Sequence, residues 1–155
     1  MTVPINAVVD EAIRFEQNLA TLYQMLRSIF AQDADFWWEL SVSEEQHARL
    51  LEAGRTLFKD EFSFETIPAD LDALRESNDS LESTLDRFAE SSPSREEAFR
   101  LGLALENDQN ELTLHRLLKI EPSQAASKLV NRIREEDSVH QQRIRDYAES
   151  CGIEL

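Results

Sequence analysis

Apolar residues recur along most of this chain at alternating spacings of three and four, the repeat of helices that bury one face. Four long segments follow the repeat, and Pro or Gly falls near several of their ends. We expect helices over about residues 7–31, 33–59, 93–120 and 124–150. The pattern therefore predicts an all-α fold in a single domain that covers residues 1–155.

The stretch between the second and third of these segments, residues 60–92, departs from the regular repeat. Pro68 lies near its start, and the leucines after it are only partly at helical spacing. We expect a long crossover that contains one or two short helices. Tight turns join the other neighbouring helices, so the chain should form two antiparallel hairpins linked by this crossover. That connectivity is typical of a ferritin-like four-helix bundle.

Each of the four expected helices carries an acidic residue near the middle of its apolar face. These acids are Glu16, Glu44, Glu106 and Asp137. His47 and His140 follow the second and fourth acids by three residues, which places acid and imidazole on one helix face. Four converging buried carboxylates are costly unless cations neutralise them, and two divalent ions supply the matching charge. The six side chains therefore form a candidate site for two metal ions.

The fourth helix allows a second register. Glu136 lies four residues before His140 and also shares its face. We prefer Asp137 as the ligand because the apolar residues around Asp137 and His140 then match those around Glu44 and His47 position by position. The same pattern could arise without a metal. The acids would then be exposed and paired with arginines, and the histidines would form hydrogen bonds within the core. A metal-free interaction bundle is therefore an alternative interpretation.

The two tyrosines and two tryptophans of the chain belong to the same helices. Tyr23 and Tyr147 lie on the apolar faces about two turns from the candidate ligands. We expect them mainly to pack in the core, with hydrogen bonding toward the metal site as the less favoured role. Adjacent helical residues point about 100 degrees apart. One of Trp37 and Trp38 is thus expected in the core, and the other at a contact between subunits.

Composition narrows the possible partners. The chain has 31 acidic and 16 basic residues and a formal net charge of −15, which disfavours nucleic acid and anionic membranes. The single cysteine, Cys151, permits no intrachain disulfide and no CxxC metal site. The first residues show no basic leader, and no apolar run is long enough to span a membrane. We therefore expect a cytoplasmic protein.

Four short segments carry a resemblance to a known family. They are Phe15-Glu16 with Tyr23 seven residues on, Ser43-Glu44-Glu45-Gln46-His47-Ala48, Ala104-Leu105-Glu106, and Glu135-Glu136-Asp137-Ser138-Val139-His140. In these segments the chain resembles the rubrerythrin branch of the ferritin-like superfamily. The resemblance implies two non-haem iron ions that react with hydrogen peroxide or dioxygen, often in a homodimer. Manganese or zinc can occupy the same kinds of ligand.

The sequence differs from this family in two respects. Rubrerythrins usually carry a rubredoxin-like domain with CxxC pairs, which this sequence lacks, so the resemblance implies a separate electron donor. They also tend to have a further acid three residues after the acid of the third helix. That position is Gln109 here, and a centre of six ligands is expected. A ferroxidase or other iron-handling protein is the alternative function for this fold.

Overall fold

A computed structural model of the chain describes residues 5–57, 68–107 and 123–155. Within these ranges the chain forms five α-helices, one short 3₁₀ helix and no strand. The elements are α1 (Ile5–Ile29), η1 (Ala31–Asp33), α2 (Ala34–Leu57), α3 (Pro68–Glu90), α4 (Arg95–Glu106) and α6 (Gln124–Ser150). The prediction of an all-helical bundle is confirmed. None of the helices in the described ranges combines the length and the apolar character needed to cross a membrane.

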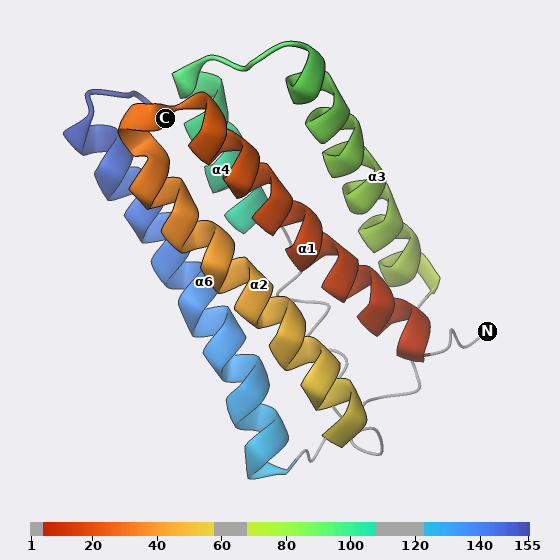
Figure 1. Cartoon of the computed structure of the whole chain (residues 1–155). Helices are drawn as coiled ribbons and strands as arrows, with labels where there is room; N and C mark the ends of the chain where they lie inside the picture. The colour runs from red at the N-terminus through yellow and green to blue at the C-terminus, as the bar shows by residue number, and fades with distance from the viewer. Residues whose placement is uncertain (1–4, 58–67, 108–122) are drawn as a thin grey trace.

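The helices run roughly parallel to one long axis and alternate in direction (Figure 1). α1 and α2 form an antiparallel pair connected by η1, and α6 packs beside α2. α4 packs against α6, while α3 lies along the outer side of α1. This arrangement gives α1, α2, α4 and α6 a shared interior, which is where the candidate ligands were expected.

Two apolar clusters fill the interior, one on each side of a polar layer. The cluster nearer the α1–α2 turn includes Phe15, Leu22, Trp37, Leu40, Phe99 and Ile144. The cluster nearer the start of α1 includes Val9, Ala12, Leu51, Leu74 and Ile133. Along α1, α2 and α6 the candidate ligands lie in sequence between members of the two clusters. The apolar packing on both sides therefore holds the polar layer away from water.

In its described part, residues 68–92, the crossover differs from the prediction, because α3 is one helix of 23 residues and not one or two short helices. Residues 60–67 of the predicted crossover lie outside the described ranges. The buried Asn78 completes the helical repeat of the apolar positions in α3. The Nδ2 atom of Asn78 donates to both the backbone oxygen and the Oε2 atom of Glu11, each at 2.9 Å. Arg14 also binds Glu82 across this interface at 2.8 and 2.7 Å. α3 is thus held along α1 by a polar residue at a seam position.

The ends of the later helices follow local capping rules. Ser94 and Ser123 precede α4 and α6, and their side chains accept hydrogen bonds from the backbone N–H groups of Glu97 and Ala126. After α6, Gly152 adopts a φ of 71°, a conformation that favours glycine. α1 ends two residues before its predicted end, and α2 begins one residue after its predicted start. Residues 58–59 of the predicted second helix and residues 108–120 of the predicted third helix lie outside the described ranges.

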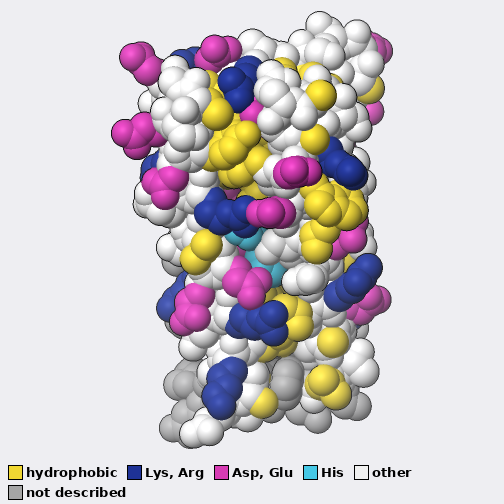
Figure 2. All heavy atoms as spheres, turned by 60° about the vertical axis from the view of Figure 1, so that its left-hand side comes forward, with side chains coloured by type: hydrophobic (Ala, Val, Ile, Leu, Met, Phe, Trp, Pro, Cys, Tyr) yellow, Lys and Arg dark blue, Asp and Glu magenta, His cyan; other side chains and the backbone are white. Residues whose placement is uncertain are grey.

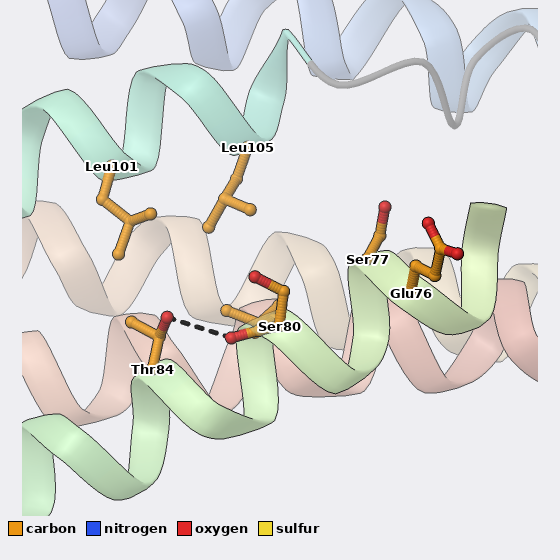
Figure 3. A pocket seen from close by; sticks show the side chains of 7 residues that line it. Glu76, Ser77, Ser80, Thr84, Leu101 and Leu105 are labelled. Atoms are coloured by element: carbon orange, nitrogen blue, oxygen red, sulfur yellow. Dashed lines mark hydrogen bonds between the residues drawn. The ribbon is translucent and has the colours of Figure 1, made fainter.

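A groove of about 300 Å³ lies between α3 and α4 (Figure 3). Leu81, Leu101 and Leu105 supply its apolar lining, and polar residues of α3 line the remainder. None of the six candidate ligands lines this groove. The groove is therefore separate from the polar layer in which the ligands lie.

Candidate metal centre

The six side chains expected to bind metal come together in the polar layer between the two apolar clusters. Glu16 comes from α1, Glu44 and His47 from α2, Glu106 from α4, and Asp137 and His140 from α6. Five of them are no more than 5% exposed, and the Asp137 side chain is 15% exposed. Four carboxylates and two imidazoles from four helices are thus removed almost completely from water.

These residues form two overlapping groups of potential ligands. One contains Glu16, Glu44 and His47, and the other Glu44, Glu106, Asp137 and His140. Within each group, one ligand atom per residue lies within 4.8 Å of all the others. Glu44 belongs to both groups: its Oε2 atom lies 3.1 Å from His47 Nδ1, and its Oε1 atom 2.8 Å from His140 Nδ1. One carboxylate therefore faces both groups, with one oxygen directed to each.

The contact between Glu44 and His140 fits a metal better than a hydrogen bond. Although the two atoms are 2.8 Å apart, both are buried and neither has a hydrogen-bond partner of acceptable geometry among the described residues. Two ligands at right angles around one ion, with bonds of about 2.1 Å, are themselves about 3 Å apart. The pair has the separation of neighbouring ligands, and the donor set of carboxylates and imidazoles suits a divalent metal.

Both histidines present their Nδ1 atoms to the centre, and their rings stack with centroids 5.6 Å apart. The outer nitrogen of His47, Nε2, lies 2.7 Å from Glu136 Oε2. Glu136 also accepts a hydrogen bond of 2.9 Å from Arg132 at the surface. A carboxylate on the outer nitrogen is a common arrangement for a metal-binding histidine, because it leaves the inner nitrogen free to bind.

The contact between Glu136 and His47 helps to decide which acid of α6 faces the interior, Asp137 or Glu136. The Asp137 carboxylate points inward, with Oδ1 at 3.3 Å from His47 Nδ1. Glu136, the alternative ligand, contacts the same imidazole from its outer side. The geometry therefore assigns the inner position to Asp137, and assigns Glu136 an orienting contact that the sequence pattern did not suggest.

Tyr23 is buried in the core, as expected, and also contacts the centre. Its hydroxyl donates a hydrogen bond of 2.6 Å to Glu106 Oε1, while Glu106 Oε2 lies 3.5 Å from His140 Nδ1. The side chain of Gln141 donates to the backbone oxygen of Glu106 at 2.8 Å, which ties the end of α4 to α6. Tyr23 and Gln141 therefore fix the position of the carboxylate that α4 supplies.

When no cation is present, burial favours the protonated form of three of the four acids, Glu16, Glu106 and Asp137. Burial raises the pKa of Glu16 and Glu106, an effect that the Glu44 carboxylate reinforces. Burial likewise raises the pKa of Asp137 to about 8. Burial opposes ionisation of Glu44 too, but the imidazoles of His140 and His47 outweigh it and hold the pKa of Glu44 well below its usual value.

The histidines show the complementary effect. Burial alone would lower the pKa of His47, but the neighbouring carboxylates of Glu16 and Glu44 raise it to about 12. For His140, the carboxylates of Glu106 and Glu44 likewise outweigh burial and raise the pKa to about 10. The polar layer therefore retains protons that exposed groups of the same kind would lose. A bound metal ion would take the place of these protons.

A small part of the histidine surface is visible on the side of the bundle formed by α2 and α6. Figure 2 shows histidine surface, in cyan, between acidic and basic side chains near the middle of this face. Two ion pairs belong to the same region: Arg132 with Glu136 along α6, and Arg143 with Glu39 between α6 and α2.

Comparison of the chain with protein-family models, with curated proteins and with solved structures finds no match. The class of protein is therefore defined by the fold and the side chains alone. It is an all-helical bundle with a buried carboxylate and histidine cluster that could hold a metal ion.

Proposed function

We propose that this protein is a ferritin-like bundle that binds two metal ions, iron by preference, and uses them to reduce hydrogen peroxide or dioxygen. The observation that carries the proposal is the Glu44 carboxylate, whose two oxygens face separate groups of ligands. A carboxylate in this position can bridge two ions. The order of the helices, an antiparallel pair followed by a crossover and a second antiparallel pair, supports the ferritin-like assignment.

Charge supports two ions rather than one. Glu16, Glu44, Glu106 and Asp137 supply four negative charges when ionised, and two divalent ions balance them. A single ion would leave two charges that only bound protons could compensate in a layer closed off from water. The site contains oxygen and nitrogen donors without a thiolate, which suits iron, manganese or zinc.

The side chains prepare the site for redox chemistry in specific ways. Bound iron would supply the exchange of electrons with the oxidant, and the anionic oxygens would favour its higher charge state. Glu136 orients His47 from outside, and Tyr23 orients Glu106. The apolar clusters on both sides restrict water, so charges in the layer interact strongly. The proposal includes a separate electron donor, and the alternative outcome is iron oxidation without turnover of peroxide.

The test is a count of metal ions per chain. Protein loaded anaerobically with ferrous iron should bind two ions, become coloured on oxidation, bleach with a reductant and regain its colour with peroxide. Glu44→Gln should lose the paired site, because the amide keeps the shape but cannot bridge two cations as a carboxylate does. Glu45→Gln is the matched control, since Glu45 is the next residue of α2 and points to Gln24 at the surface.

Three results would count against the proposal. The protein could take up no iron, Glu44→Gln could bind as much as Glu45→Gln, or iron could bind with no response to peroxide or dioxygen. The first two results would favour a metal-free bundle. The third would favour iron handling without peroxide or dioxygen reduction.

A further inference from the structure

An unbroken line of aromatic rings leads from the candidate metal centre to one end of the bundle. Tyr23 stacks on Trp37 with ring centroids 5.5 Å apart. Trp37 meets the edge of Phe36 at 5.0 Å, and Phe36 stacks on Tyr147 at 4.2 Å with an angle of 10° between the rings. Phe99 lies beside the same line, 4.7 Å from Trp37. Each ring therefore contacts the next through the interior.

The two ends of this line are hydrogen-bonded to carboxylates. At the inner end, Tyr23 donates to the candidate ligand Glu106 at 2.6 Å. At the outer end, Tyr147 is partly exposed and donates to Asp33 at 2.9 Å. Arg95 holds Asp33 in place with two further hydrogen bonds of 2.8 and 2.6 Å.

The distribution of oxidisable aromatic residues is uneven. The chain has two tyrosines and two tryptophans, and three of these four residues lie on this line. The fourth, Trp38, is 43% exposed and faces Arg27 at the surface. Apolar packing alone does not require tyrosine or tryptophan here, because phenylalanine and leucine fill the rest of the cluster.

The hydrogen bonds match what electron transfer through such residues requires. A tyrosine that loses an electron also loses its phenolic proton, so it needs an acceptor beside the hydroxyl. Tyr23 and Tyr147 each have a carboxylate there. Trp37 Nε1 is buried and has no partner among the described residues, an unusual state for a buried indole. Trp37 can therefore pass an electron without giving up its proton to a neighbour.

We propose that Tyr147, Phe36, Trp37 and Tyr23 form a path for single electrons from the protein surface to the metal centre. This inference rests on the proposed function, which supplies an oxidised centre as the electron acceptor. The donor is an external one-electron reductant of the ascorbate class. Phe36 is not oxidised and serves only as the contact between Trp37 and Tyr147.

The transfers balance in electrons and protons. When an oxidised metal centre is present, Tyr23 would give it one electron and would give its phenolic proton to Glu106. Trp37 returns one electron to Tyr23, which takes its proton back, and Trp37 becomes a radical cation. Tyr147 then reduces Trp37 and leaves its own proton on Asp33. One electron from the external donor, with the proton from Asp33, restores Tyr147. One electron has moved inward and no proton is consumed along the path.

The path can be tested in full-length protein without metal, at alkaline pH, so that the Glu106 carboxylate, whose pKa burial raises, is ionised and can take the proton of Tyr23. Cys151 is the single cysteine of the chain and lies four residues after Tyr147, at the end of α6. A ruthenium polypyridyl photosensitiser attached to Cys151 generates an oxidant at the outer end of the path after a flash and a soluble quencher. In the variant Tyr147→Phe, Tyr23 is the sole remaining tyrosine. A tyrosyl radical seen by transient absorption in that variant must therefore be at Tyr23.

The matched comparison uses the two neighbouring tryptophans. In the Tyr147→Phe background, adding Trp37→Phe should cause loss of the Tyr23 radical, while adding Trp38→Phe should leave its yield unchanged. Replacing Tyr23 with Phe in the same background should leave a tryptophan radical that persists, because nothing reduces it. This last variant keeps an aromatic ring at every position of the path, so it still tests the path if the Trp37→Phe variant does not fold. The ruthenium oxidant should also be reduced faster in labelled wild type than in Tyr147→Phe.

Equal radical yields in the two tryptophan variants would overturn the path, as would a tryptophan radical that decays equally fast with and without Tyr23. Because these experiments use no metal, either result leaves the proposed metal binding intact. Failure to bind iron would remove the acceptor and with it the proposed function, but would leave the measured transfer between rings unaffected.

Discussion

Two buried polar clusters in this bundle contain carboxylates, and the carboxylates of the two clusters are neutralised in different ways. At the α1–α2 turn, Asp33 is 1% exposed and is held by the guanidinium of Arg95 and the hydroxyl of Tyr147. In the polar layer, Glu16, Glu44, Glu106 and Asp137 have two histidines beside them. Across the described ranges, no lysine or arginine forms an ion pair with any of these four acids.

The difference separates a structural role from a binding role. When an acid is paired with a cation from its own chain, its charge is already neutralised once the protein folds. Acids that converge without such a cation need protons or a metal to be tolerated in a layer of low polarity. Burial of carboxylates alone therefore does not indicate a metal site; burial without an arginine or lysine partner leaves a group of ligands that could hold a metal ion.

Removing the internal cation should have the largest effect on stability. Arg95→Met would leave Asp33 buried and unpaired, and we expect a loss of about 3 kcal/mol in the free energy of unfolding. The loss should be the same with and without metal, because this cluster is not part of the metal site. Urea denaturation measures it, and Arg100→Met on the exposed side of α4 is the control. A loss that disappears on adding iron would show that the two clusters are not independent.

A smaller effect is expected from the residue that orients His47. Glu136→Ala removes the carboxylate on Nε2, and should weaken metal binding by about 10- to 100-fold. Glu135→Ala, the exposed neighbour on α6, should bind metal as the wild type does. Metal titration measures the affinities, and ¹⁵N spectra of His47 report which nitrogen carries the proton. Glu136→Gln should restore part of the affinity, because the amide oxygen can still accept from Nε2. Equal affinities for the two alanine variants would rule out the orienting role.

A further effect is a dependence of stability on pH that comes from the polar layer. The pKa of Asp137 is raised to about 8, and those of His140 and His47 to about 10 and 12. Between the ordinary pKa of Asp137 and about pH 10, folded protein without metal binds more protons than the unfolded chain, so the free energy of unfolding falls as pH rises. Glu44, whose pKa is lowered, acts in the opposite direction only in acid.

Thermal unfolding at about pH 6 and about pH 9 checks this sign. The melting temperature of metal-free protein should be higher at the lower pH, and the difference should shrink in Asp137→Asn. Metal should remove or reverse the trend, because it replaces the protons. Metal-free protein that gains stability steadily over this interval would contradict the assigned proton balance.

The helices and the six inward side chains were predictable because each depends on a repeat along a single helix. The spacing of three between Glu44 and His47, or between Asp137 and His140, places both groups on one face whatever the helix packs against. The long helix α3 was missed because its seam contains Asn78, and a polar residue at a core position interrupts an apolar pattern. The distinction between Asp137 and Glu136 also needed the structure, since both share a face with His140.

The polar cluster at the α1–α2 turn could not be predicted from spacing. Asp33 is 62 residues from Arg95 and 114 from Tyr147, and nothing local marks them as partners. The contact of Glu136 with His47 joins residues 89 positions apart, and likewise nothing local marks these two residues as partners. Interactions between distant segments depend on how the helices pack, which the pattern within one helix does not contain.

The position of Glu44 also affects how the two ions would bind. Because one carboxylate faces both groups of ligands, the positions are thermodynamically linked, and each ion changes the affinity for the other by the same factor. The first ion would fix the Glu44 side chain in the orientation that the second requires, and would leave enough negative charge to attract it. Metal titrations should then depart from the curve for two independent sites, and removing either histidine should weaken binding at both positions.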